Sequence, residues 1–306
     1  MPNSKEFCPM FPSCNKQPAT STWIEFHKRN RTIPACAADY KLSKHVRGMT
    51  LLELVIAMSL LALVMGTLAG LARTSQQGFE YSEGYGAATQ HARVALDRIS
   101  RTIYGATANE QFPGCIVIAE TINSWRYPDT LVVWRPNGAA ADPNGLPRYC
   151  ELVIYCPQTN NPKQLVEITA PIDTRTVPPI TDTASWQTEI AAIKTNSLSK
   201  VVNLTDLLRF CPIATSTGSP LRGAVRFETR LRPSQSEWND FKNNLVNWKD
   251  LSWVQGYYGW QAGIRQVWVR IELQLVPQAP NGSASPGNRV PAPFFGSASL
   301  YYQMRH

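Results

Sequence analysis

The chain has 306 residues and a formal net charge of +8, and its length suffices for one large domain or two small ones with a proper core. Most of the positive charge lies in residues 1–48, where eight Lys or Arg and three Asp or Glu give +5, so that residues 49–306 carry only +3. So small a positive charge would attract the phosphate backbone only weakly, and nucleic acid is therefore disfavoured as a partner.

The segment before the first apolar run is basic and shows no apolar periodicity. Residues 1–40 are rich in Pro, Asn and Lys, which predicts disorder. A mis-assigned start is another interpretation, because translation from near Leu42 would leave only LSKHVRG before Met49. By the positive-inside rule this basic flank stays in the cytoplasm, and everything after Ala72 lies across the membrane.

An apolar run of membrane length extends over 24 residues, from Met49 to Ala72, with Glu53 as its only ionisable side chain. An ionised carboxylate in hydrocarbon costs at least ~2.5 kcal/mol on insertion scales, so Glu53 needs a reason beyond anchoring. An incidental polar residue near the membrane interface is one alternative. A cleavable signal peptide is another, with LAGLA before Arg73 as the cleavage site, but its apolar region would run only ~7–15 residues.

Beyond this run, apolar side chains recur at steps of three and four residues, which predicts an amphipathic helix. The predicted stripe consists of Ala88, Ala92, Leu96, Ile99 and Ile103, while Arg93, Asp97, Arg98 and Arg101 fall largely elsewhere. We expect one helix from about Met49 to Tyr104, with residues 49–72 in the membrane and residues 73–107 as the amphipathic continuation. Each of Gly78, Gly84 and Gly86 weakens a helix by ~1 kcal/mol relative to Ala, so we expect a bend or unwinding within residues 78–86.

From Cys115 onward the sequence changes to short β-rich runs between turn signals such as RPNG and DPNG. The predicted strands are CIVIAE, TLVVWR, ELVIYC, GAVRFETRL, RQVWVRIELQLV and SASLYYQM. Residues 234–248 are predicted to form a short helix or a loop, and residues 277–293 a long Pro/Gly/Ser loop. The predicted fold class is therefore α+β, with a long N-terminal helix packed on an antiparallel β-rich globular domain at residues 108–306.

Four cysteines follow the apolar run: Cys115, Cys150, Cys156 and Cys211. An even number of thiols in an oxidising compartment could form two disulfides. A strand between Cys150 and Cys156 would hold them ~20 Å apart, beyond disulfide reach, so each would pair with Cys115 or Cys211. Ordinary buried thiols are an alternative. Zinc is a further one, although the chain has no C-x-x-C and no His near these cysteines.

No catalytic constellation is found after the apolar run. Only His91 and His306 remain there, and the sequence contains no G-x-S-x-G, P-loop or H-E-x-x-H motif. DPNG at Asp142 and TDTAS at Thr181 offer isolated carboxylates for calcium, without a D-x-D-x-D run. We therefore expect a protein that is not an enzyme, with no metal and no cofactor.

The residues around Glu53 resemble a known processing signal. Arg47-Gly48, then Met49-Thr50-Leu51-Leu52-Glu53 and an unbroken apolar helix resemble the N-terminus of type IV pilins and type II secretion pseudopilins. The resemblance implies that a prepilin peptidase cuts between Gly48 and Met49 and methylates the new amine of Met49. It also implies that Glu53 neutralises the Met49 ammonium of a neighbouring subunit. The family usually has Phe where Met49 stands and a leader much shorter than 48 residues.

A looser likeness concerns the kind of subunit. ARVALDRISRTIYGA and GYYGWQAGIRQVWVRIELQL resemble the larger minor pseudopilins, particularly the J-type subunit, and the W-type minor pilin. This implies a minor subunit of a type II secretion pseudopilus or a type IV pilus, at the tip or in initiation. The implied partners are other pilin subunits, the prepilin peptidase, the inner-membrane assembly platform and membrane lipid. The implied location is the inner membrane, single-pass, with the C-terminal domain in the periplasm.

The alternative function is a membrane-tethered binding module for carbohydrate or DNA that uses a Trp-rich β-domain. Arg226, Arg230, Arg232 and Arg270 would supply charge to such a ligand face. The tryptophans in question are Trp125, Trp134, Trp186, Trp238, Trp248, Trp253, Trp260 and Trp268. Most of these side chains are expected to be core or interface aromatics instead.

Overall fold

The structure is a computed structural model that describes residues 49–122, 125–213, 221–251, 253–254, 262–277 and 290–304. The predictions for the segment before Met49 lie outside these residues, as does most of the predicted Pro/Gly/Ser loop. The chain divides into two compact units between Ser59 and Leu60. All of the described β-strands belong to the second unit.

The first element is the helix α1, Leu51–Tyr104, of 54 residues, which corresponds to about 81 Å at ~1.5 Å per residue. It confirms the predicted long helix. The helix is uninterrupted through Gly78, Gly84 and Gly86, so the predicted unwinding is wrong. The glycine penalty is small beside the tertiary packing that fixes the helix, because α1 is buried against the β-domain from Gly84 onward.

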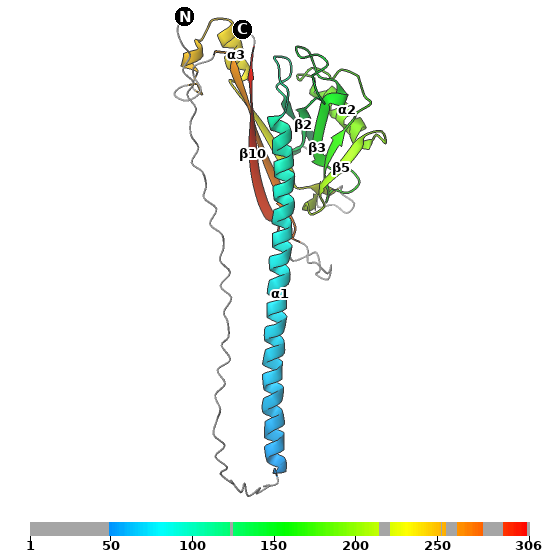
Figure 1. Ribbon diagram of the computed structural model, residues 1–306, viewed down its shortest axis with the longest axis vertical. Coiled ribbons are helices and arrows are strands. Elements are labelled where there is room, and N and C mark those ends of the chain that lie inside the picture. Colours follow the sequence, from blue (N-terminus) through cyan, green and yellow to red (C-terminus); the bar gives the residue numbers. More distant parts are fainter. Residues whose placement is uncertain are drawn as a thin grey trace, which may run out of the picture. The chain divides into compact units, whose positions relative to one another are not determined.

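A five-stranded antiparallel sheet in the order β1-β2-β3-β4-β5 follows the helix (Figure 1). Its strands are β1 (Cys115–Ile122), β2 (Trp125–Trp134), β3 (Leu152–Pro157), β4 (Leu165–Thr169) and β5 (Lys200–Thr205). Short 3₁₀ helix η1 (Tyr149–Glu151) leads into β3, and helix α2 (Thr183–Thr195) connects β4 to β5. Both outer faces of this sheet are covered, so its central strands are almost continuously apolar.

A second, three-stranded antiparallel sheet has the order β10-β9-β8. It consists of β8 (Val225–Arg232), β9 (Ile264–Leu275) and β10 (Ala292–Gln303). A two-stranded hairpin, β6 (Phe210–Pro212) and β7 (Leu221–Gly223), precedes it. Helix α3 (Gln235–Lys242) and 3₁₀ helix η2 (Trp248–Asp250) lie between β8 and β9 in the chain.

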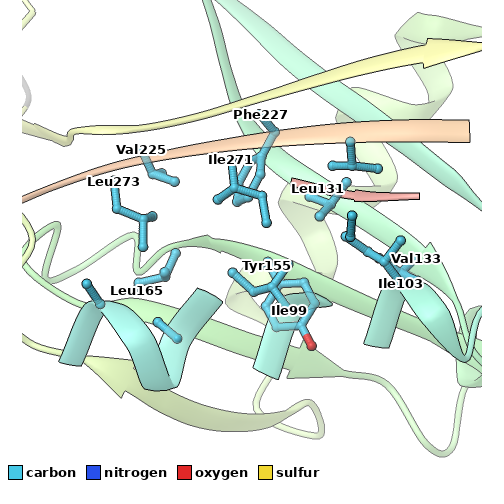
Figure 2. Packing of buried hydrophobic residues seen from close by; sticks show 14 of the residues in the cluster. Ile99, Ile103, Leu131, Val133, Tyr155, Leu165, Val225, Phe227, Ile271 and Leu273 are labelled. Atoms are coloured by element: carbon cyan, nitrogen blue, oxygen red, sulfur yellow. The ribbon is translucent and has the colours of Figure 1, made fainter. Parts of the chain in front are cut away.

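The main core joins α1 to both sheets. Ile99 and Ile103 of α1 are fully buried and belong to one cluster with Leu131 of the five-stranded sheet and Phe227 and Ile271 of the three-stranded sheet. Figure 2 shows these side chains pointing into a common interior. Gly296 of β10 allows α1 to pack closely against this strand, since a Cβ there would lie 2.9 Å from Leu96 Cδ2.

The predicted apolar stripe of α1 is confirmed in this core. Ala88, Ala92, Ile99 and Ile103 are fully buried, and Leu96 is half-buried. The opposite face of the five-stranded sheet carries a second cluster, in which α2 contributes Trp186, Ile190 and Ile193. A third, smaller cluster surrounds Trp238 of α3.

Candidate functional site

The N-terminal half of α1 is the part of the described chain with the largest exposed apolar surface. Every residue from Met49 to Phe79 is exposed, including Leu51 at 82% and Leu63 at 66%. Among the described helices, α1 is the one long and apolar enough to cross a membrane. Its 24-residue apolar run corresponds to about 36 Å of helix, against a hydrocarbon thickness of about 30 Å. Such a surface requires lipid or protein to cover it.

The beginning of α1 is fixed by Thr50. Its Oγ1 accepts a hydrogen bond of 3.3 Å from the backbone N–H of Glu53, and its carbonyl oxygen accepts from the N–H of Leu54 at 3.2 Å. Thr50 is therefore the N-cap of α1, and Glu53 is the third helical residue. The T-x-x-E spacing of Thr50 and Glu53 is that of a capping box. This spacing is visible in the sequence, but the charge of Glu53 alone does not indicate it.

This arrangement places three features within one helical turn. Met49 stands just before the helix and is 61% exposed, Thr50 caps it, and Glu53 is exposed in its first turn. A carboxylate is favourable there, because the helix N-terminus carries partial positive charge. A new ammonium at Met49 would be unfavourable at that same end unless a carboxylate lay nearby. Gly48, the other predicted processing residue, lies outside the described residues.

Comparison with known proteins supports one family. Residues 43–69 match the family model described as the prokaryotic N-terminal methylation motif. No curated protein and no solved structure gives a significant match. The chain thus carries a prokaryotic N-terminal methylation motif, which supports the type IV pilin and pseudopilin family.

The four cysteines are free thiols in the structure. Cys115 belongs to the cluster shared with α1, whereas Cys156 belongs to the cluster on the opposite face of the five-stranded sheet. Burial raises the pKa of each of these two thiols to about 12. Cys150 lies in η1 and Cys211 in β6. The predicted disulfides stay a prediction, and the placement of Cys115 and Cys156 fits the alternative of buried thiols.

The tryptophans do not gather into an exposed face among the described residues. Trp134, Trp186, Trp238 and Trp248 are buried, whereas Trp125 is 71% exposed. Trp268 is half-buried on β9, with the Arg230 guanidinium 5.8 Å from its ring centroid. Trp260 lies outside the described residues. The expectation that most of these aromatics are core residues is confirmed for the four buried ones.

The remaining candidate residues have local partners. Asp142 accepts backbone hydrogen bonds from Asn144 and Gly145, and Asp182 caps α2 by accepting from the N–H of Ser185. The described residues hold no group of three or more His, Cys, Asp or Glu that could bind a metal ion. His91 Nδ1 lies 3.2 Å from Thr205 Oγ1 and 4.0 Å from the Asp206 carboxylate. His306 lies outside the described residues.

A polar cluster fastens α1 to the five-stranded sheet. Arg98 donates two hydrogen bonds to the Glu167 carboxylate, at 2.8 and 2.9 Å. The Tyr155 hydroxyl donates to the same carboxylate at 3.0 Å and lies 2.6 Å from Thr102 Oγ1. Hydrogen bonding to Arg98 holds the pKa of Glu167 below its usual range, against the opposing effect of burial.

Glu167→Gln is expected to lower the free energy of unfolding by about 1–2 kcal/mol at neutral pH, because it removes a buried, charge-assisted contact whose partner is half exposed. Since the pKa of Glu167 is lowered by folding, its contribution is complete above the unfolded-state value of ~4.3 and is lost as pH falls through the folded-state pKa. The variant should therefore lose less stability than the original chain on acidification below about pH 4. Urea unfolding of the full chain in detergent micelles at several pH values measures this.

Asp97→Asn is the matched control. It breaks the 2.8 Å pair between Asp97 and Arg101 on the exposed face of α1, where both side chains are more than half exposed. An exposed i,i+4 pair contributes only about 0.3–0.5 kcal/mol. Equal losses for Glu167→Gln and Asp97→Asn would contradict a fastening role for the Glu167 cluster.

Proposed function

We propose that this chain is a non-enzymatic minor subunit of a type II secretion pseudopilus or a type IV pilus. It is processed between Gly48 and Met49 and assembles through the apolar half of α1. One observation carries the proposal. Where the chain matches the methylation motif, α1 begins with a capped first turn that contains a single acid and continues as an exposed apolar surface of membrane length.

The physical role of Glu53 follows from processing. Removal of the leader leaves an ammonium at Met49, just before the first turn of α1. In a bundle of such helices, Glu53 of one subunit neutralises the ammonium of the next. A buried ion pair adds doubtful net stability, but a subunit that slips along the helix axis leaves two unpaired charges in a low dielectric. The pair therefore selects one axial register among otherwise similar apolar contacts.

The globular part supports a minor rather than a major subunit. The 258 residues that follow Gly48 are too many for the commonest major pilins, and they include two separate sheets and a hairpin. In this proposal the domain lies in the periplasm at the tip or initiating position, and the apolar run holds the subunit in the inner membrane. From there the assembly platform extracts it into the filament.

Mature protein is expected to begin at N-methylated Met49, and intact mass with N-terminal sequencing of membrane-extracted chain measures this. The matched comparison is a host that lacks a prepilin peptidase, where the full leader should remain. Gly48→Val should likewise keep the leader, because a side chain there obstructs the peptidase. Protein that retains Arg47 in a peptidase-containing host, or that begins at Arg73, would contradict the proposal.

A further inference from the structure

A groove of about 730 Å³ runs along one edge of the three-stranded sheet. One wall contains the six consecutive residues from Ala224 to Thr229, and the other wall includes Arg126 to Asp129 of β2 and Arg222 of β7. Its volume lies within the range of about 300–1,000 Å³ that is typical of ligand sites. The groove belongs entirely to the β-domain and is separate from the apolar half of α1.

One wall of the groove is an edge strand. β8 pairs with β9 on one side, and no described strand pairs with its other side. An edge strand presents backbone N–H and C=O groups that can pair with a further extended chain. The groove follows β8 from Val225 to Thr229, about 16 Å at ~3.3 Å per residue, which is enough for a partner strand of about five residues.

The interior of the groove is already neutralised by its own ion pairs. Arg222 Nε lies 2.6 Å from Asp129, and its NH2 lies 2.7 Å from Glu120. Asp129 is 4% exposed, so this contact is largely shielded from solvent. Lys194 adds a 3.6 Å contact to Glu120. These groups fasten the β6–β7 hairpin to the five-stranded sheet and hold the second wall in place.

The remaining charge in the groove is positive. Glu228 forms an ion pair with Arg230 at 3.1 Å, and Glu272, which lies opposite Arg226 in the strand register, does not line the groove. Neither Arg126 nor Arg226 forms an ion pair within the described part of the chain, and both side chains are exposed. Two unpaired guanidinium groups beside a free strand edge favour carboxylates on whatever chain binds there.

We propose that this groove binds an extended acidic segment of a partner protein, which adds as a further strand to the free edge of β8. Backbone hydrogen bonds to β8 supply the affinity, and carboxylates of the segment contact Arg126 and Arg226. The charge match makes the groove selective, since a neutral or basic strand gains the same backbone bonds but leaves both guanidinium groups unpaired.

The test uses the full chain in detergent micelles and a fluorescein-labelled octapeptide in which Glu alternates with Val and Thr. Saturable binding is expected by fluorescence anisotropy. The double variant Arg126→Glu with Arg226→Glu should weaken it by at least about tenfold. The matched control is Arg232→Glu, an exposed arginine on the same strand that does not line the groove. It should change the affinity by less than about twofold.

Two altered peptides separate strand addition from simple charge attraction. A peptide of the same charge with alternate backbone amides N-methylated should bind at least about tenfold more weakly, because it cannot complete the strand pairing. A peptide with Lys in place of Glu should also bind at least about tenfold more weakly, because it leaves both guanidinium groups unpaired. Equal affinity for the N-methylated peptide, no saturation up to about 1 mM, or no effect of the double variant would overturn the proposal.

Hydrogen exchange provides an independent measurement that needs no protein variant. Bound peptide should slow the exchange of amides in Val225–Thr229, because the free edge of β8 then donates to the added strand. Amides of the exposed edge strand β5, which lies in the other sheet, serve as the internal control. Protection of β5 instead of β8 would place the peptide elsewhere and overturn the proposal.

Discussion

Replacing Glu53 with Leu is expected to abolish incorporation of the chain into filaments while membrane insertion stays normal or improves. Insertion does not need the carboxylate, because an ionised acid in the membrane costs at least ~2.5 kcal/mol and Leu is favourable there. Assembly does need it in the proposed function, because the Met49 ammonium of the neighbouring subunit is otherwise left unpaired. Removing one partner of a buried ion pair costs about 3–5 kcal/mol, enough to suppress assembly by about two orders of magnitude or more.

The capping geometry of Thr50 offers a rival explanation, and Glu53→Gln separates the two. The Glu53 backbone N–H bonds Thr50 Oγ1, and a Glu or Gln at this third helical position completes a capping box equally well. If Glu53 only capped α1, Gln would restore assembly. If it neutralises an ammonium, Gln fails almost as completely as Leu, since an amide carries no charge.

Glu83→Leu is the matched control for both variants. Glu83 is an exposed acid on the same helix, beyond the apolar run and outside the methylation motif. Crosslinking of subunits in membranes and recovery of sheared filaments measure assembly, while carbonate extraction measures insertion. Normal filaments from Glu53→Leu would contradict the proposed role of the acid and would favour α1 as a mere anchor.

The sequence predicted the elements whose apolar pattern is strong. Val267, Val269, Ile271, Leu273 and Leu275 alternate along β9, and all five are buried in the core. The apolar stripe on α1 has the helical period, and the residues of this stripe are buried against the sheets. In β9 every second side chain must be buried, and in α1 the side chains of one helix face must be buried. The apolar pattern along the sequence therefore predicts which residues form the tertiary contacts.

The missed elements have weaker local patterns. α2 has a buried face of only three residues, Trp186, Ile190 and Ile193. Asp182, which looks like an isolated carboxylate in the sequence, caps the beginning of this helix. β5 exposes Val201 and Val202 at the sheet edge, so its pattern does not alternate. Such segments take their conformation from neighbouring strands, which a single sequence does not reveal.

The candidate sites divide in the same way. The proposed processing site depends on residues adjacent in the chain, Arg47 to Glu53, so a single sequence suffices to propose it. The groove along β8 brings together Arg126 and Arg226, which lie 100 positions apart. Nothing in the local sequence around either arginine indicates the other, because their proximity arises from the packing of two sheets.

Ile99→Ala is expected to lower the free energy of unfolding by about 2–5 kcal/mol, a large stability effect on the packed half of α1. Ile99 is fully buried among residues of both sheets (Figure 2). Its truncation removes apolar contacts with the helix and with two sheets at once, and the surrounding strands cannot collapse onto the space without breaking their register. Urea unfolding of the full chain in micelles, followed by fluorescence of the buried tryptophans, measures the loss.

Val94→Ala is the matched control, because Val94 lies five residues earlier on the same helix and is 60% exposed. It removes two methyl groups without opening a cavity and should change stability by less than about 0.5 kcal/mol. A loss below about 1 kcal/mol for Ile99→Ala would mean that α1 is held mainly by its polar contacts. Because Ile99 lies far along α1 from Met49, the proposed processing between Gly48 and Met49 should be unchanged in Ile99→Ala, although its β-domain is less stable.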